Sequence, residues 1–131
     1  MKKLSNKIGE MEFDGLVTDI IPEVQVRGGT LRKLAAEATI SRGTILAKSS
    51  GTAGDGKLVI LGTAAAENET LTPDCILCDD TVVGTSADVK AAVYTAGCFD
   101  INKCAVASGH TVSAAEYDAL RVRDIVFKSA E

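Results

Sequence analysis

The chain has 131 residues, enough for one domain and too few for two full-sized ones. Hydrophobic residues make up 46% and charged residues 24%, so the composition is that of a folded globular protein and not of a disordered chain. Fourteen Lys and Arg against eighteen Asp and Glu give a formal net charge of −4, the wrong sign for a nucleic-acid-binding protein. We therefore expect a small acidic domain with no nucleic-acid partner.

We expect neither a membrane-spanning segment nor a secretory leader. No apolar run approaches the roughly 20 residues that a transmembrane helix needs, and Met1-Lys2-Lys3 opens no signal-peptide core. We expect no membrane partner and a cytosol-like compartment in which the four Cys stay reduced. One His and no Trp leave few side chains for His-pair metal sites or base stacking, so the composition favours a binding or assembly module.

Residues 1–38 differ in pattern from the rest, and we interpret them as an N-terminal arm. Alternation over residues 23–27 predicts a strand, Gly28 and Gly29 break the chain, and residues 31–38 have helix-like spacing. The arm carries seven apolar side chains that would promote aggregation if they stayed in water. They are Phe13, Leu16, Val17, Ile20, Ile21, Val24 and Val26.

Two interpretations of these seven residues stay open. They form an ordinary first strand of the core, or they pair with the edge of another protein's sheet. In the second case main-chain hydrogen bonds supply affinity and alternate side chains supply register. An extended chain over residues 1–27 would reach up to about 90 Å, several times the radius of a compact domain of this size.

Residues 39–131 have the pattern of a compact, strand-rich core. Short β-prone runs predict five strands, the first two of which form a hairpin, and a polar spacer at residues 67–74 precedes the third. In the fifth run, Val89, Ala91 and Val93 share one face. The predicted strands cover residues 44–48, 57–61, 75–78, 81–83 and 88–94.

One helix start is well marked near the end of the chain. Ser113 stands three residues before Glu116, the spacing of a capping box, and predicts a helix over residues 114–120. Residues 121–127 are then the last predicted strand. Short strands at close spacing with one or two short helices indicate a mainly β (α+β) fold, a small barrel or sandwich.

The stretch from Gly51 to Lys57 has the spacing of a phosphate-binding loop. Leu58, however, stands where such a loop has the Ser or Thr that holds magnesium, and the loop leads into a β-prone run instead of a helix. Asp55 would also repel an anion. We interpret the stretch as a hairpin turn, with nucleotide binding as the alternative.

The four Cys raise the question of a zinc site. Cys75 and Cys78 form a Cys-x-x-Cys pair, but Cys98 and Cys104 do not repeat that tight spacing. In a strand, residues three apart point to opposite faces, which separates Cys75 from Cys78. We interpret the thiols as buried and structural, with zinc binding and redox activity as alternatives, and expect no metal or other cofactor.

The remaining chemical candidates lack readable partners. His110 is the only imidazole, and the adjacent Asp79 and Asp80 diverge on a strand or cap a turn together. We therefore assign no catalytic residue and expect that the protein is not an enzyme. A small metal or nucleotide enzyme stays as an alternative class.

Three stretches carry a resemblance to a known family. Residues 39–46 combine a polar turn, Arg-Gly and an apolar run; residues 92–99 end a strand at Gly before an aromatic residue; residues 119–125 pass from a helix to a strand. In their order and spacing, residues 39–128 resemble the head decoration proteins of lambda-like tailed phages. Residues 1–38 correspond only in position to that family's variable N-terminal arm.

The resemblance implies a small barrel, or β-tulip-like, decoration-protein fold with an extended arm. It also implies a homotrimer that binds the major capsid protein at three-fold sites on the outer surface of an expanded head, after synthesis in the host bacterial cytoplasm. We expect the seven apolar arm residues to make that contact. Two positions depart from the family pattern, Cys98 where a polar residue is expected and Asp124 where Gly is expected. A trimeric phage fibre or adhesion module is the alternative function.

Overall fold

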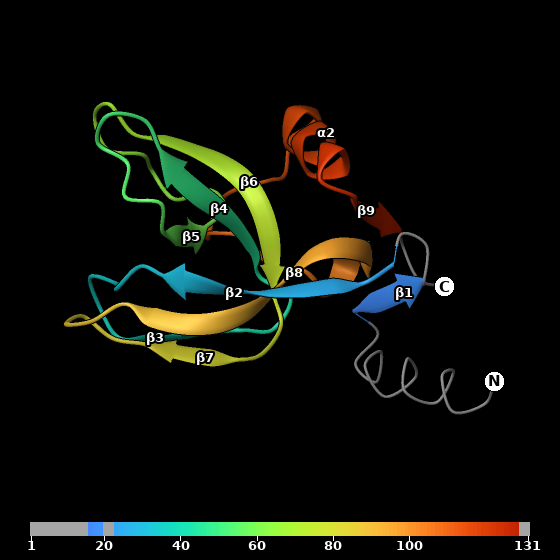
Figure 1. Ribbon diagram of the computed structural model, residues 1–131, viewed down its shortest axis with the longest axis horizontal. Helices are drawn as coiled ribbons and strands as arrows, with labels where there is room; N and C mark the ends of the chain where they lie inside the picture. The colour runs from blue at the N-terminus through green and yellow to red at the C-terminus, as the bar shows by residue number, and fades with distance from the viewer. Residues whose placement is uncertain (1–15, 20–22, 129–131) are drawn as a thin grey trace.

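The computed structural model describes residues 16–19 and 23–128 of the chain (Figure 1). Strands hold 45% of the described residues and helices 11%, and five strands close into a barrel, so the predicted mainly β fold with a small barrel is confirmed. The elements in chain order are β1 (Val17–Asp19), β2 (Gln25–Leu31), β3 (Ala38–Ile40), β4 (Ile45–Ser50), β5 (Leu58–Ile60), β6 (Thr70–Leu77), β7 (Thr81–Val83), β8 (Val89–Asp100), the 3-10 helix η1 (Ile101–Lys103), α2 (Ala114–Val122) and β9 (Ile125–Lys128).

The barrel has the strand order β2, β5, β4, β6, β8 and then returns to β2. β8 closes it, because this strand is antiparallel both to the whole of β2 and to the end of β6. The weakest seam lies between β2 and β5, which meet in parallel at a single pair, Leu31 and Leu58. Closure of the barrel removes most unpaired strand edges. At this seam, however, β2 pairs along most of its length with β8 alone.

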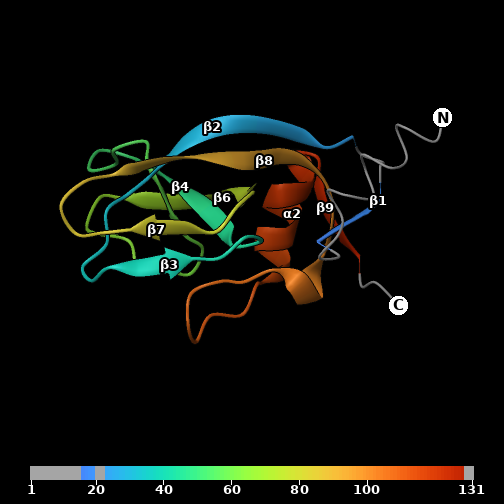
Figure 2. The ribbon, with the colours of Figure 1, turned by 90° about the horizontal axis from the view of Figure 1, so that it is seen from below.

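The second half of β8 extends beyond the barrel and pairs with β1 on one side and β9 on the other. Two views place β1, β9 and α2 at one end of the molecule, and the separate β3–β7 pair at the other (Figure 1, Figure 2). η1 follows β8 directly. Four short elements therefore gather where β8 ends.

Two hydrophobic clusters form the core, because the barrel strands bury both faces. Ile45, Leu46 and Ala47 of β4 are all fully buried, yet Leu46 belongs to one cluster and its two neighbours to the other, as strand alternation requires. The barrel cluster takes side chains from all five barrel strands, and the helix cluster packs against α2 and β9. The barrel cluster contains Leu31, Ile40, Leu46, Leu58, Cys75, Leu77, Val83 and Val93. The helix cluster contains Leu16, Val17, Ile45, Ala47, Leu61, Ile76, Cys78, Tyr94, Phe99, Leu120 and Ile125.

The capping box predicted at the start of α2 is confirmed. The Ser113 hydroxyl accepts a hydrogen bond from the Glu116 N–H at 3.2 Å, and the Glu116 carboxylate accepts one from the Ser113 N–H at 2.8 Å. The helix continues past the predicted end to Val122 and buries Leu120, so the last strand begins later than predicted. Within the described ranges, no helix has the length and apolar character needed to cross a bilayer.

The chain break predicted at Gly28 and Gly29 is wrong, and the helix-like spacing over residues 31–38 marks no helix. β2 continues through both glycines to Leu31, and residues 32–37 form no helix. Close packing explains the glycines, because a Cβ on Gly29 would lie 2.7 Å from Leu58 Cδ1. Leu31 and Leu34, whose spacing looked helical, instead meet in the barrel cluster. β1 and β2 thus share a sheet and the hydrophobic clusters with the described elements that follow them. The division of the chain into an arm over residues 1–38 and a core stays a prediction.

The polar spacer expected at residues 67–74 is also wrong, because β6 begins inside it at Thr70. The strand tolerates the polar sequence through a bulge against β4 and through ion pairs to its one buried charge. Asp74 is only 3% exposed, and Arg123 and Arg27 lie 3.0 Å and 3.5 Å from its carboxylate oxygens. Asp74, a charged residue that favoured the prediction of a loop, therefore lies in the interior.

Each stretch that carries the family resemblance contains, or lies next to, a residue with a positive φ angle. Gly43 has φ +93°, and a Cβ there would lie 2.6 Å from the Lys103 carbonyl oxygen. Gly97 has φ +147°, and a Cβ would lie 2.9 Å from the Phe99 ring. Asp124 has φ 66°, the left-handed conformation that the glycine expected there would adopt readily. The local geometry at Asp124 is thus glycine-like although the residue is not.

Candidate assembly surface

The structure separates the seven predicted arm residues into different environments. Leu16 and Val17 are 1% and 2% exposed in the helix cluster, and Val24 packs partly buried against the same cluster. Val26 is 55% exposed on β2. Phe13, Ile20 and Ile21 lie outside the described residues.

Contacts with β8 explain why Leu16 and Val17 are buried. Val17 pairs with Phe99 of β8, and the Asp100 N–H donates a hydrogen bond of 2.7 Å to the Leu16 carbonyl. Leu16 and Val17 therefore behave as residues of an ordinary core strand, the first of the two interpretations. Contact with a capsid by any of the seven residues stays a prediction.

β2 presents an open edge, which we define as its residues 25–30 on the side away from β8. Within residues 16–19 and 23–128, β2 pairs with β8 along its whole length but with β5 only at Leu31. Val26 projects from this half of the strand, and a Cβ on Gly28 would meet no atom within 4 Å. The open edge is therefore smooth, solvent-facing and long enough to bind an extended segment.

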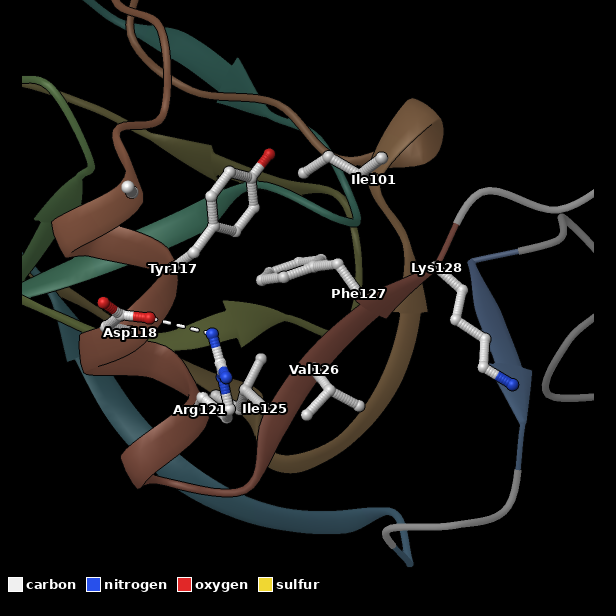
Figure 3. Close-up of a pocket in the computed structure, with 9 residues that line it drawn as sticks. Ile101, Tyr117, Asp118, Arg121, Ile125, Val126, Phe127 and Lys128 are labelled. Atoms are coloured by element: carbon white, nitrogen blue, oxygen red, sulfur yellow. Dashed lines mark hydrogen bonds and ion pairs between the residues drawn. The ribbon is translucent and has the colours of Figure 1, made fainter.

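A second surface feature is a groove of about 490 Å³ between α2 and β9 (Figure 3). Its floor is apolar and aromatic, with the Tyr117 and Phe127 rings 5.5 Å apart in an edge-to-face contact. Asp118 and Arg121 form an exposed ion pair of 2.8 Å at its rim. The lining residues are Ile101, Ala114, Tyr117, Asp118, Arg121, Ile125, Val126, Phe127 and Lys128.

The other end of β2 carries a network of ion pairs. Arg32 donates two hydrogen bonds to Asp55, at 2.9 Å and 3.1 Å, and a third to Glu69 at 2.5 Å. Ser49 also donates to Glu69, at 2.5 Å. The Arg32 guanidinium lowers the pKa of Asp55 to about 2. The Ala66 N–H, the Ser49 hydroxyl and Arg32 together lower the pKa of Glu69 to about 2.

This network also accounts for the loop that resembles a phosphate-binding loop. The stretch from Gly51 to Lys57 joins the antiparallel strands β4 and β5, as the hairpin interpretation predicts. The Asp55 carboxylate is held by Arg32, and Lys57 pairs with Asp88 at 2.5 Å. The charged side chains of the loop, Asp55 and Lys57, thus form ion pairs that hold the loop against neighbouring segments.

The thiols lie where strand geometry predicts. Cys75 belongs to the barrel cluster and Cys78 to the helix cluster, on opposite faces of β6 and the residue that follows it. All four Cys are free thiols. Burial raises the pKa of Cys75 far above its usual range, that of Cys78 to about 11 and that of Cys104 to about 12. Among the described residues, no group of three or more His, Cys, Asp or Glu could hold a metal ion.

The remaining candidates of the sequence have local partners. His110 Nε2 lies 2.9 Å from the Glu116 carboxylate, which also caps α2, and its side chain packs over Gly62. The Asp80 carboxylate accepts a hydrogen bond of 2.6 Å from the Arg42 N–H. These contacts stabilise two separate turns. They do not bring His110 and Asp80 together in one site.

Sequence reasoning missed the open edge of β2, the groove and the Arg32 network. Each depends on residues far apart in the chain; Arg32, for example, is 23 residues from Asp55 and 37 from Glu69. No local sequence pattern marked any of the three. Neither a scan against protein-family models nor a search of curated proteins found a match for the chain.

Proposed function

We propose that this protein is a non-enzymatic capsid decoration protein. It forms homotrimers and binds the outer surface of an expanded phage head at three-fold sites, where it clamps neighbouring major capsid subunits. Two observations support the proposal: residues 39–128 resemble such proteins in sequence, and the chain folds as the small, mainly β barrel that the resemblance implies.

The open edge of β2 is the observation that carries the mechanism. A strand edge offers unpaired main-chain donors and acceptors, and an extended capsid segment can satisfy them by adding a strand. Val26 stands on this half of β2 with 55% of its surface exposed, and burial of an apolar side chain adds to the main-chain bonds. The smooth backbone at Gly28 leaves room for close approach.

Weak individual contacts suffice in this mechanism. A net contribution of about 1 kcal/mol per added hydrogen bond makes one short strand a modest binder. A trimer that engages three such sites at once binds with the effective concentration of a multivalent ligand. The bound trimer then holds neighbouring capsid subunits together, because its dissociation requires several contacts to break at the same time.

The test measures attachment to expanded heads assembled without the protein. We expect saturable binding, and Val26→Lys should weaken it by about tenfold or more, because a charged side chain on an edge strand opposes strand addition. Val82→Lys is the matched control, since Val82 is a strand valine of similar exposure, 58%, on β7. Equal weakening by both variants would contradict the use of the β2 edge. Absence of saturable attachment by the unaltered protein would favour a fibre or adhesion module.

A further inference from the structure

Two arginines share one buried carboxylate at a point where β2, β6 and the end of α2 meet. The Asp74 side chain, on β6, is 3% exposed, and its Oδ1 lies 3.0 Å from Nη1 of Arg123, the C-terminal cap of α2. Its Oδ2 lies 3.5 Å from Nη2 of Arg27, on β2. Among the residues that the structure describes, neither arginine forms a second ion pair. The cluster therefore holds two positive charges and one negative charge.

Neutralisation of Asp74 accounts for only one of these two arginines. A buried carboxylate needs a close counter-charge, and Arg123 supplies it at 3.0 Å. Arg27 is the looser partner, because its distance of 3.5 Å exceeds the roughly 3.2 Å of a good hydrogen bond and 59% of its side chain is exposed. In a chain of net charge −4, this surplus positive charge is opposite to the overall charge. Arg27 is thus able to bind a second carboxylate from outside the chain.

Arg27 stands within the open edge of β2, next to the exposed Val26. Successive side chains of a strand point to opposite faces, so an added strand places one residue beside Val26 on one face and the next beside Arg27 on the other. Residues directly opposite each other across a pair of strands have Cβ atoms about 5 Å apart, and opposite charges there stabilise the pairing. The open edge therefore favours a segment in which an acidic residue adjoins an apolar one.

We propose that the segment that adds to the open edge of β2 is acidic, with an Asp or Glu opposite Arg27 that completes a cluster of two arginines and two carboxylates. The adjacent residue of the segment, opposite Val26, is apolar. The charge also fixes the register, because a shift by one residue would place the carboxylate beside Val26. That the segment belongs to the capsid protein rests on the proposed function, whereas its chemistry follows from β2 and the cluster alone.

A pair of synthetic peptides tests the charge requirement without any capsid. One is a strand-forming peptide with a central Glu flanked by valines, and the other has Gln in place of that Glu. NMR titration of the full chain follows the main-chain amides of β2 and the Nε–H groups of Arg27 and Arg121. We expect the Glu peptide to bind about threefold or more tightly than the Gln peptide and to shift the Arg27 signal but not that of Arg121. Equal affinities, no binding by either peptide, or no shift at Arg27 would overturn the proposal.

Variants of the chain separate recognition from a purely structural role of Arg27. Arg27→Gln should abolish the preference for the Glu peptide, whereas Arg121→Gln, which removes the same charge from an exposed ion pair on α2, should keep it. A preference that survives Arg27→Gln would overturn the proposal. Thermal unfolding shows that each variant is folded.

The variant Asp74→Asn should change affinity in the opposite direction. It removes the carboxylate that competes for Arg27, so the folded variant should bind the Glu peptide about threefold or more tightly. An arginine that served only to neutralise Asp74 would give no such gain, and an unchanged or lower affinity would contradict the proposal. If Asp74→Asn does not fold, Arg27→Gln decides the question by itself.

Expanded heads separate this proposal from the proposed function. Arg27→Gln should weaken attachment about threefold or more relative to Arg121→Gln and should make it less sensitive to salt. Equal attachment by the two variants would overturn the acidic segment and leave capsid decoration in place. Heads that bind none of the unaltered chain would contradict capsid decoration, while the peptide titrations still decide the chemistry of the open edge.

Discussion

The two ends of β2 lie in opposite environments. At its C-terminal end, Leu31 is 1% exposed and pairs on both sides, with β5 and β8, and Arg32 then binds two carboxylates. At its N-terminal end, Val26 is 55% exposed and pairs on one side only. One strand thus closes the barrel with one end and offers an edge with the other. The proposed recognition by β2 is therefore separable from its contribution to stability, and substitutions can address the two independently.

The largest expected effect is at the closed end. Leu31→Ala should lower the free energy of unfolding by about 2–5 kcal/mol, because it leaves a cavity in the barrel cluster. Val26→Ala should change it by no more than about 0.5 kcal/mol, since the side chain is mostly in water. Urea unfolding of the two variants measures the difference. Similar losses for both would contradict the contrast between the two ends.

Acid should weaken the closed end selectively. Asp55 and Glu69 have a pKa of about 2 in the folded protein, below the ordinary values of 3.8 and 4.5. Depressed carboxylate pKa values contribute stability that is full above the ordinary pKa and is lost as pH falls through the folded pKa. Stability should therefore decline between about pH 4.5 and pH 2.

The variant Asp55→Asn checks the source of that decline. It should be less stable than the unaltered protein at pH 7 and should lose less stability on acidification, because one titrating ion pair is gone. Asp118→Asn is the control, since Asp118 forms an exposed pair on α2 that screening makes weak. Thermal unfolding across this pH range gives the comparison, and identical slopes for Asp55→Asn and the unaltered chain would contradict the account.

The smallest expected effects separate the two glycines of β2. Gly28→Ala should raise the free energy of unfolding by about 0.5 kcal/mol, because the strand position is open and alanine reduces the entropy of the unfolded chain. Gly29→Ala should lower it by about 1 kcal/mol, because the new methyl group would press on Leu58 in the barrel cluster. Denaturant titrations resolve both signs. A stabilising Gly29→Ala would show that β2 and β5 pack less closely than described.

Local signals in the sequence predicted much of the fold. The Ser113–Glu116 capping box located α2, and the alternation of Val89, Ala91 and Val93 located β8 and its buried face. These signals succeed because they act between residues a few positions apart. The same rule of alternation placed Cys75 and Cys78 on opposite faces.

The errors came from residues whose partners are distant. Gly28 and Gly29 suggest a break by themselves, but β8 and Leu58 supply the ladder and the close packing that keep them in a strand. Asp74 suggests a loop until Arg27 and Arg123, each more than 45 residues away, neutralise it. The open edge of β2 and the groove are properties of the tertiary arrangement, so no local pattern could have located them.

The most direct test of the capsid-decoration proposal is electron cryomicroscopy of expanded heads that were assembled without the protein and then incubated with it. We predict added density on the outer surface at the three-fold positions, with the open edge of β2 against a strand of the capsid subunit. Heads that stay bare at saturating protein concentration would contradict the account.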